Sequence, residues 1–171
     1  MRDLFDAHYA AIWRLLRRLG VEPSQLDDAA QEVFWVAARR LADIERGREH
    51  SFLYGVALRI ASNEHRRRKH LAEPIDLDQL ELVADGAPSP EEQLDERRAR
   101  ALLDVVLDRM PIDLRTVFVL CELEELEVRE VALLEGVPLG TASSRLRRAR
   151  EEFSAIAKRV RATLSARGGV R

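Results

Sequence analysis

The 171-residue chain contains one cysteine, eight glycines and six prolines, and it has no long uninterrupted apolar run. A single cysteine excludes an internal disulfide, so Cys121, within the apolar segment VFVLCEL, is expected to be a small buried side chain. No apolar stretch approaches the roughly 18 residues that span a bilayer, and no secretory signal is expected at the N-terminus. These absences predict a reduced, cytoplasmic protein without membrane insertion.

Strand-like alternation is also missing, whereas 34% of the residues are charged and Leu, Ala, Arg and Glu dominate. This composition favours helices. Apolar residues recur every three or four positions in segments that begin near Leu4, Ser24, Ser51 and Pro90. We expect Gly20 to end the first helix, and Ser24 and Ser51 to cap the second and third. The predicted fold class is all-α.

The formal net charge of −2 conceals an uneven distribution of charge. Residues 1–71 carry +3, residues 72–96 carry −9 and residues 97–171 carry +4. The acidic segment holds three prolines and a glycine, which predicts a flexible linker. It could serve solubility alone, or it could compete with nucleic acid for the basic surfaces or dock on a partner. The predicted organisation is two small helical domains, 1–71 and 96–171, joined by an acidic flexible linker, 72–95.

The stretch EGVPLGTASSRLRRAR, residues 135–150, indicates the turn and second helix of a helix-turn-helix. Gly136 allows a left-handed turn, and Pro138 tolerates a helix start because its missing N–H is not needed there. Four apolar residues at spacings of four, three and four are expected to be buried: Ala142, Leu146, Ala149 and Phe153. The remaining faces carry hydroxyl and guanidinium groups, which can contact bases or phosphates. The alternative is an arginine-rich amphipathic helix in an ordinary bundle.

The segment VALLEGVPLGTASSRLRRARE resembles the C-terminal DNA-binding region of bacterial sigma-70 family factors of the extracytoplasmic-function (ECF) type. Glu135 occupies a position that is often apolar in such motifs. The segments DDAAQEVFWVAARRL and SFLYGVALRIASNEHRRR independently resemble region 2 of the same family, and the two regions stand in the family's order. The resemblance implies a factor that binds core RNA polymerase, through its β′ clamp helices and β flap, and directs it to promoter DNA. It also implies control by an anti-sigma factor.

The resemblance assigns roles to individual residues. Reading of the minus-thirty-five element is expected from Thr141, Ser144, Arg145, Arg147 and Arg148. Docking on the polymerase is expected from Asp27, Asp28, Gln31 and Glu32, although the helix dipole alone also favours acidic residues at a helix start. Contact with the minus-ten element, including stacking of an extruded base on an aromatic ring, is expected from Phe52, Tyr54, Arg59, Asn63, Arg66 and Arg67. For the two aromatic residues, packing in the core is the alternative.

The sequence predicts no enzyme, cofactor or metal site. The four histidines lack metal-ligand spacing, and there is no phosphate loop, nucleophile elbow or HExxH motif. The expected mechanism is binding by two tethered domains, each of which can be weak alone because the tether makes the second contact intramolecular. A stand-alone helix-turn-helix transcriptional regulator with a helical N-terminal domain is the alternative function.

Overall fold

The described part of the chain consists of helices and the turns between them. A computed structural model describes residues 2–45, 47–71 and 92–168, and within these ranges seven α-helices and no strand are present. The all-α prediction is therefore confirmed for the described residues. Most of the predicted acidic linker, residues 72–91, lies outside them.

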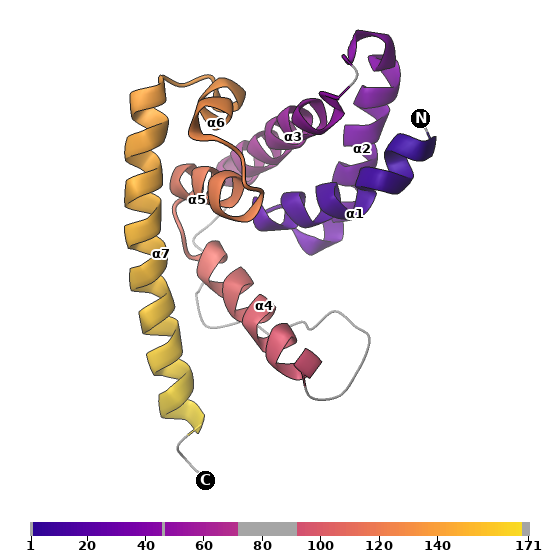
Figure 1. The fold of residues 1–171 in the computed structure, drawn as a ribbon. Helices are drawn as coiled ribbons and strands as arrows, with labels where there is room; N and C mark the ends of the chain where they lie inside the picture. Colours follow the sequence, from indigo (N-terminus) through magenta and orange to yellow (C-terminus); the bar gives the residue numbers. More distant parts are fainter. Residues whose placement is uncertain (1, 46, 72–91, 169–171) are drawn as a thin grey trace.

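The N-terminal half is built from α1 (Arg2–Arg18), α2 (Leu26–Arg39) and α3 (Glu49–Leu71). The three helices pack against one another in pairs, and short 3₁₀ turns at Pro23–Gln25 and Leu41–Asp43 connect them (Figure 1). Each helix buries an apolar stripe that includes Ile12, Leu16, Ala30, Val33, Leu53 and Ala57. Burial of each large apolar side chain contributes about 1.5–3 kcal/mol to folding.

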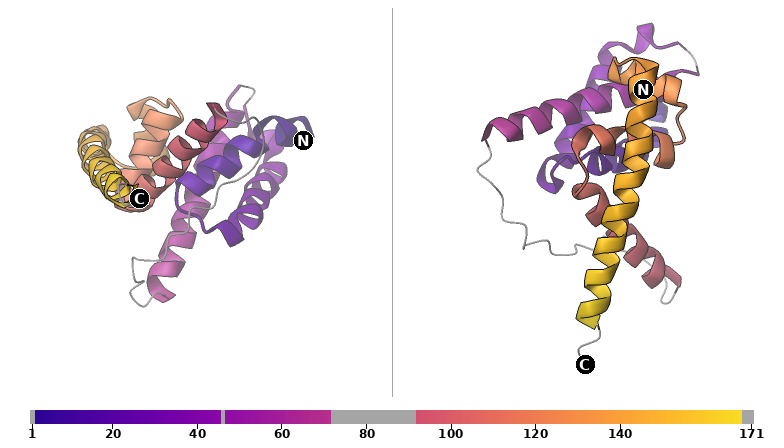
Figure 2. Two further views of the ribbon diagram at one scale, coloured as in Figure 1. Left: turned by 90° about the horizontal axis from the view of Figure 1, so that it is seen from below. Right: turned by 90° about the vertical axis from the view of Figure 1, so that its left-hand side faces the viewer.

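The C-terminal half is organised around one long helix, α7 (Leu139–Gly168). Packed against it are α4 (Glu92–Asp108), α5 (Ile112–Phe118) and α6 (Val128–Glu135). A π-helical turn, Val119–Leu123, continues α5. Figure 2 shows that α7 runs beyond the other helices of this half at its C-terminal end. The first turn of α4 falls within the segment predicted as linker, because α4 already begins at Glu92.

The two halves pack on each other and share one hydrophobic core. Helix α3 lies against α6, where a Cβ added at Gly55 would lie 3.3 Å from Cδ2 of Leu134. This close approach explains why a residue without a side chain suits this position on α3.

A buried arginine also joins the halves. Arg115 of α5 is 6% exposed, and its guanidinium donates hydrogen bonds to the backbone carbonyls of Arg18 and, at 3.2 Å, Arg17. Its Nη1 also forms an ion pair of 2.9 Å with Asp108. The cation therefore lies on the C-terminal carbonyls of α1, where the helix dipole favours positive charge. Gly20, with φ of 89°, leaves room for this guanidinium, since an added Cβ would lie 3.1 Å from Nη1.

Two predicted caps are wrong. Ser24 lies inside the 3₁₀ turn that starts at Pro23, so the N-cap of α2 is Gln25, which forms no side-chain capping bond. Ser51 lies inside α3, because that helix begins two residues earlier, at Glu49. The predicted end of the first helix is confirmed, since α1 ends at Arg18 and Gly20 adopts the left-handed conformation. Cys121, which was expected to be buried, is only partly buried.

Candidate nucleic-acid interface

The turn between α6 and α7 has the geometry that its sequence predicts. Gly136 has φ of 66° and ψ of 33°, the left-handed conformation that glycine adopts without strain. The N–H of Val137 then donates to the carbonyl of Ala132 at 3.0 Å, which closes α6. The carbonyl of Pro138 accepts from the N–H groups of Thr141 and Ala142 at 2.9 and 3.1 Å, which opens α7. Helices α6 and α7 therefore form a helix-turn-helix.

The predicted apolar stripe fixes the orientation of α7. Ala142, Leu146 and Ala149 are buried as expected, whereas Phe153 is only partly buried and stacks its ring on Phe118 of α5 at a centroid separation of 4.5 Å. The opposite face of α7 is thus turned to solvent. Ser144 on that face is exposed, and its hydroxyl donates to the carbonyl of its own helix at Thr141 (2.9 Å).

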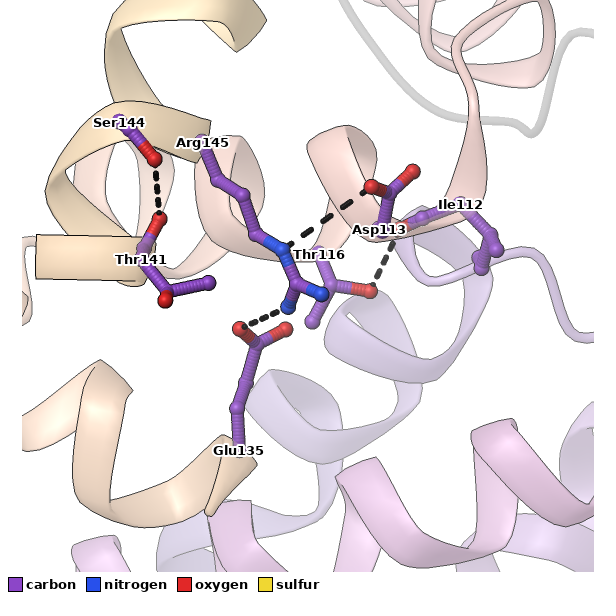
Figure 3. A network of polar contacts seen from close by, with 7 residues as sticks. All are labelled: Ile112, Asp113, Thr116, Glu135, Thr141, Ser144 and Arg145. Carbon is purple, nitrogen blue, oxygen red and sulfur yellow. Dashed lines mark hydrogen bonds and ion pairs between the residues drawn. The ribbon is translucent and has the colours of Figure 1, made fainter. Parts of the chain in front are cut away.

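The four arginines within residues 145–150 of α7 differ in how they are paired. Arg145 contacts Glu135 and Asp113, as Figure 3 shows, and Arg150 donates two hydrogen bonds to Glu122 at 2.9 and 2.7 Å. Arg147 pairs with Glu151 one turn away at 2.7 Å, but both side chains are largely exposed. Such pairs contribute only about 0.3–0.5 kcal/mol. Arg148 is exposed and forms no ion pair with any residue of the described ranges.

Glu135 occupies the position where an apolar residue is usual, and its surroundings suit a paired carboxylate. Its side chain is 11% exposed, and Nη1 of Arg145 donates to Oε2 at 3.2 Å. Burial raises the pKa of Glu135 above its ordinary value, and the Arg145 guanidinium opposes that rise. Nε of Arg145 lies 4.0 Å from Oδ2 of Asp113, a looser contact with a half-exposed partner. Arg145 therefore lies between carboxylates of α5 and α6.

The residues expected to contact a minus-ten element divide between an open face and a closed one. On α3, four polar residues are exposed at helical spacing: Arg59, Asn63, Arg66 and Arg67. Tyr54, by contrast, is 2% exposed, and its hydroxyl donates to a carboxylate oxygen of Glu124, 70 residues later in the chain. The ring of His50 packs on Tyr54 at a centroid separation of 3.9 Å, while Phe52 is partly buried.

Glu124 also joins the two halves. Its second carboxylate oxygen accepts from Nη1 of Arg18 at 2.8 Å, so one side chain bridges α1 and α3. Burial, and then the hydrogen bond from its hydroxyl to Glu124, raise the pKa of Tyr54 well above its ordinary value. We refer to Glu124, Arg18 and Tyr54 as the polar bridge.

The acidic residues expected to dock on a polymerase lie at the start of α2. Asp27 is engaged within the N-terminal half, because it accepts from the indole N–H of Trp13 at 3.0 Å and the hydroxyl of Tyr9 at 3.3 Å. Burial and the Asp27 charge raise the pKa of Tyr9. The other three acidic or amide residues point to solvent: Asp28, Gln31 and Glu32.

The sequence reasoning missed an exposed aromatic residue beside them. Trp35 is 61% exposed, and with Phe5, Gln31, Glu32 and Phe34 it lines a shallow hollow. The Arg39 guanidinium lies 4.6 Å from the Trp35 ring centroid, within cation–π range. The spacing of four residues from Gln31 to Trp35 places both on one face of α2, and this spacing was the sequence signal that could have identified Trp35.

Over the part of the chain that the structure describes, no helix has the length and apolar character needed to cross a membrane.

Comparisons with known proteins match both halves of the chain. The family model for Sigma-70 region 2 matches residues 4–71, and the model for Sigma-70, region 4 matches residues 100–153. The ECF RNA polymerase sigma factor SigE of Mycolicibacterium smegmatis is 30% identical over 151 residues, which cover 88% of this chain and 59% of that relative. The ferric citrate uptake sigma factor FecI of Escherichia coli is 30% identical over 152 residues, covering 87% of this chain and 86% of FecI.

Solved structures of sigma factors have a similar fold. The sigma factor RpoE of Bartonella quintana, in complex with the anti-sigma factor NepR, superposes with a TM-score of 0.68 at 17% identity, covering 92% of this chain and 96% of that one. CnrH, in complex with the cytosolic domain of CnrY, gives 0.63 at 21% identity, covering 91% and 86%. The match of residues 4–71 to region 2 disfavours the alternative of a stand-alone helix-turn-helix regulator. The chain belongs to the sigma-70 family of RNA polymerase sigma factors, in its extracytoplasmic-function group.

Proposed function

We propose that this protein binds core RNA polymerase in the cell interior and directs it to promoters with minus-ten and minus-thirty-five elements. The observation that carries the proposal is the presence of regions 2 and 4 in order, each with polar or basic side chains on an open helix face. The role is one of binding, because each region offers surfaces for macromolecules.

The minus-thirty-five element is read by α7 in this proposal. Its exposed residues are Ser144, Arg147 and Arg148, and the half-buried Thr141 lies one turn before them. Hydroxyls and guanidinium groups at the start of a recognition helix can reach base edges in the major groove and the flanking phosphates. The minus-ten element is contacted by the exposed row on α3: Arg59, Asn63, Arg66 and Arg67. Phe52 and Tyr54 join them if the contact with the C-terminal half opens, since Tyr54 is buried beneath it.

The polymerase is bound by the outward face of α2 in this proposal. Asp28, Gln31 and Glu32 supply polar contacts to the β′ clamp helices, Asp27 fixes the start of the helix, and Trp35 adds an apolar anchor. Exposed tryptophans are common among the residues that dominate binding energy at interfaces. Region 4 contacts the β flap. An anti-sigma factor is a further partner, in line with the complexes of RpoE with NepR and of CnrH with CnrY.

Transcription from a promoter library by core polymerase, with and without this protein, tests the proposal. We expect new start sites preceded by two shared sequence elements, and the absence of new start sites would contradict it. Arg148→Ala should weaken the use of these promoters. Arg161→Ala is the matched control, because Arg161 is an exposed arginine of the same helix beyond the region 4 match.

A further inference from the structure

The buried stripe of α7 has a basic residue on each of its borders. Arg145 follows Ala142 by three residues and precedes Ala149 by four, so it lies at the edge of the stripe. Arg150 lies at the other edge, four residues after Leu146. Each border arginine pairs with a carboxylate of a neighbouring element, whereas Arg147 and Arg148 lie on the open face.

The contacts of Arg145 hold its guanidinium away from the open face. Its side chain is 28% exposed, and it lies between Glu135 of α6 and Asp113 of α5 (Figure 3). If Arg145 swung out to a base, the Glu135 carboxylate would remain nearly buried without its cation, which is costly for a charged group. The pairing therefore opposes direct contact between Arg145 and DNA.

We propose that Arg145 is a positioning residue that fixes the recognition helix on α5 and α6, and that Arg148 is the arginine that reads the minus-thirty-five element. This proposal rests on the proposed function, because it requires that α7 lies in the major groove. Arg148 is one turn after Ser144, on the same exposed face, and no ion pair within the described ranges occupies it. Its guanidinium is thus available for a bidentate contact with a guanine edge or a phosphate.

The presence of an acidic residue at position 135 is explained by its pairing with Arg145. The Glu135 side chain is nearly buried, as an apolar side chain would be at this position, and its carboxylate also neutralises the charge of Arg145. A buried ion pair can often be replaced by apolar residues of similar size at little cost, whereas loss of one partner alone is damaging. The pair Glu135→Leu with Arg145→Met should therefore keep α7 in place without any charge at either position.

The test is a double-mutant cycle with two readouts, measured on the full chain and on its complex with core polymerase. Thermal unfolding should show that Arg145→Met alone lowers the melting temperature and that adding Glu135→Leu restores much of the loss. In transcription from minus-thirty-five variants, the double variant should keep the base preference of the wild type. Arg148→Ala should relax that preference, by roughly 5- to 150-fold at the position it reads.

Two results would overturn the proposal. Additive effects of the two substitutions on the melting temperature would show that Glu135 and Arg145 are not coupled. A double variant that melts like the wild type but loses its base preference would show that Arg145 itself reads DNA. If the wild type produced no start sites, the proposed function would fail instead, and the unfolding cycle alone would still decide whether Arg145 is held by Glu135.

Discussion

Replacing Glu124 with alanine removes the centre of the polar bridge between the two halves. The Glu124 side chain is 12% exposed and accepts from both Arg18 and Tyr54. The substitution leaves the hydroxyl of the buried Tyr54 without its acceptor. It also leaves the partly exposed Arg18 without its counter-charge, although water can reach Arg18 and limit that loss.

The expected magnitude follows from these two contacts. A hydrogen bond to a charged group contributes about 1.5–3 kcal/mol, and two bonds that share one carboxylate are not additive. With the exposure of Arg18 taken into account, we expect the contact between the halves to weaken by about 2–3 kcal/mol. Since 1.4 kcal/mol corresponds to a factor of ten, the opened population should rise roughly 30- to 150-fold.

Native-state hydrogen exchange measures this opening directly. Protection should fall by that factor at the amide of Leu126, which donates to Leu120 at 2.9 Å in the π-helical region, and at amides of α3 next to Tyr54. Glu151→Ala is the control, because it removes a carboxylate from an exposed pair. Unchanged protection on α3 in Glu124→Ala would refute the view that this carboxylate holds the halves together.

Three further predictions concern Trp35 on α2, His50 on α3 and Gly136 in the turn between α6 and α7. Trp35→Ala should weaken binding to core polymerase by roughly 30-fold or more, the usual effect of a dominant tryptophan. Leu164→Ala, at a 49% exposed position beyond the region 4 match, should not weaken it, and equal affinities for both variants would contradict this role of Trp35. Burial, and then the charge of His8, lower the pKa of His50, so the folded state binds a proton at His50 less readily than the unfolded state does. The melting temperature should therefore fall as the pH drops below about 6.5. In His50→Gln this part of the pH dependence, measured by thermal melts, should be flatter. Gly136→Ala should lower the free energy of unfolding, measured by urea titration, by about 1–2 kcal/mol, because residue 136 has a left-handed backbone. Gly140→Ala should not lower it, because an added Cβ there meets open space. An unchanged free energy of unfolding in Gly136→Ala would exclude backbone strain at this position.

The sequence predicted those features that local spacing determines. The apolar stripe of α7 and the left-handed Gly136 follow from periodicity and backbone sterics, so both were found without a structure. The two predicted serine caps were wrong, because Ser24 belongs to a 3₁₀ turn that precedes α2 and Ser51 lies inside α3, which already begins at Glu49.

Contacts between distant segments were beyond the reach of the sequence. Nothing near Tyr54 indicates that a carboxylate 70 residues later accepts its hydroxyl, and nothing near Arg145 shows which of its acidic neighbours it meets. The exposure of Trp35 likewise depends on how α1 and α2 cross. The positions of side chains on each helix were thus predictable, but their partners across helices were not.

The placement of Arg115 on the end of α1 has a consequence for folding while the chain is being synthesised. The bond from Arg115 to the carbonyl of Arg18 spans 97 residues. At a translation rate of about 5–20 residues per second, roughly 5 to 20 seconds separate the synthesis of the acceptor from that of its donor. During that interval the Arg18 carbonyl lacks this donor, whereas the Arg17 carbonyl can already accept from the N–H of Gly20, at 3.0 Å in the folded chain. The C-terminal end of α1 therefore gains this side-chain donor only after α5 has been synthesised.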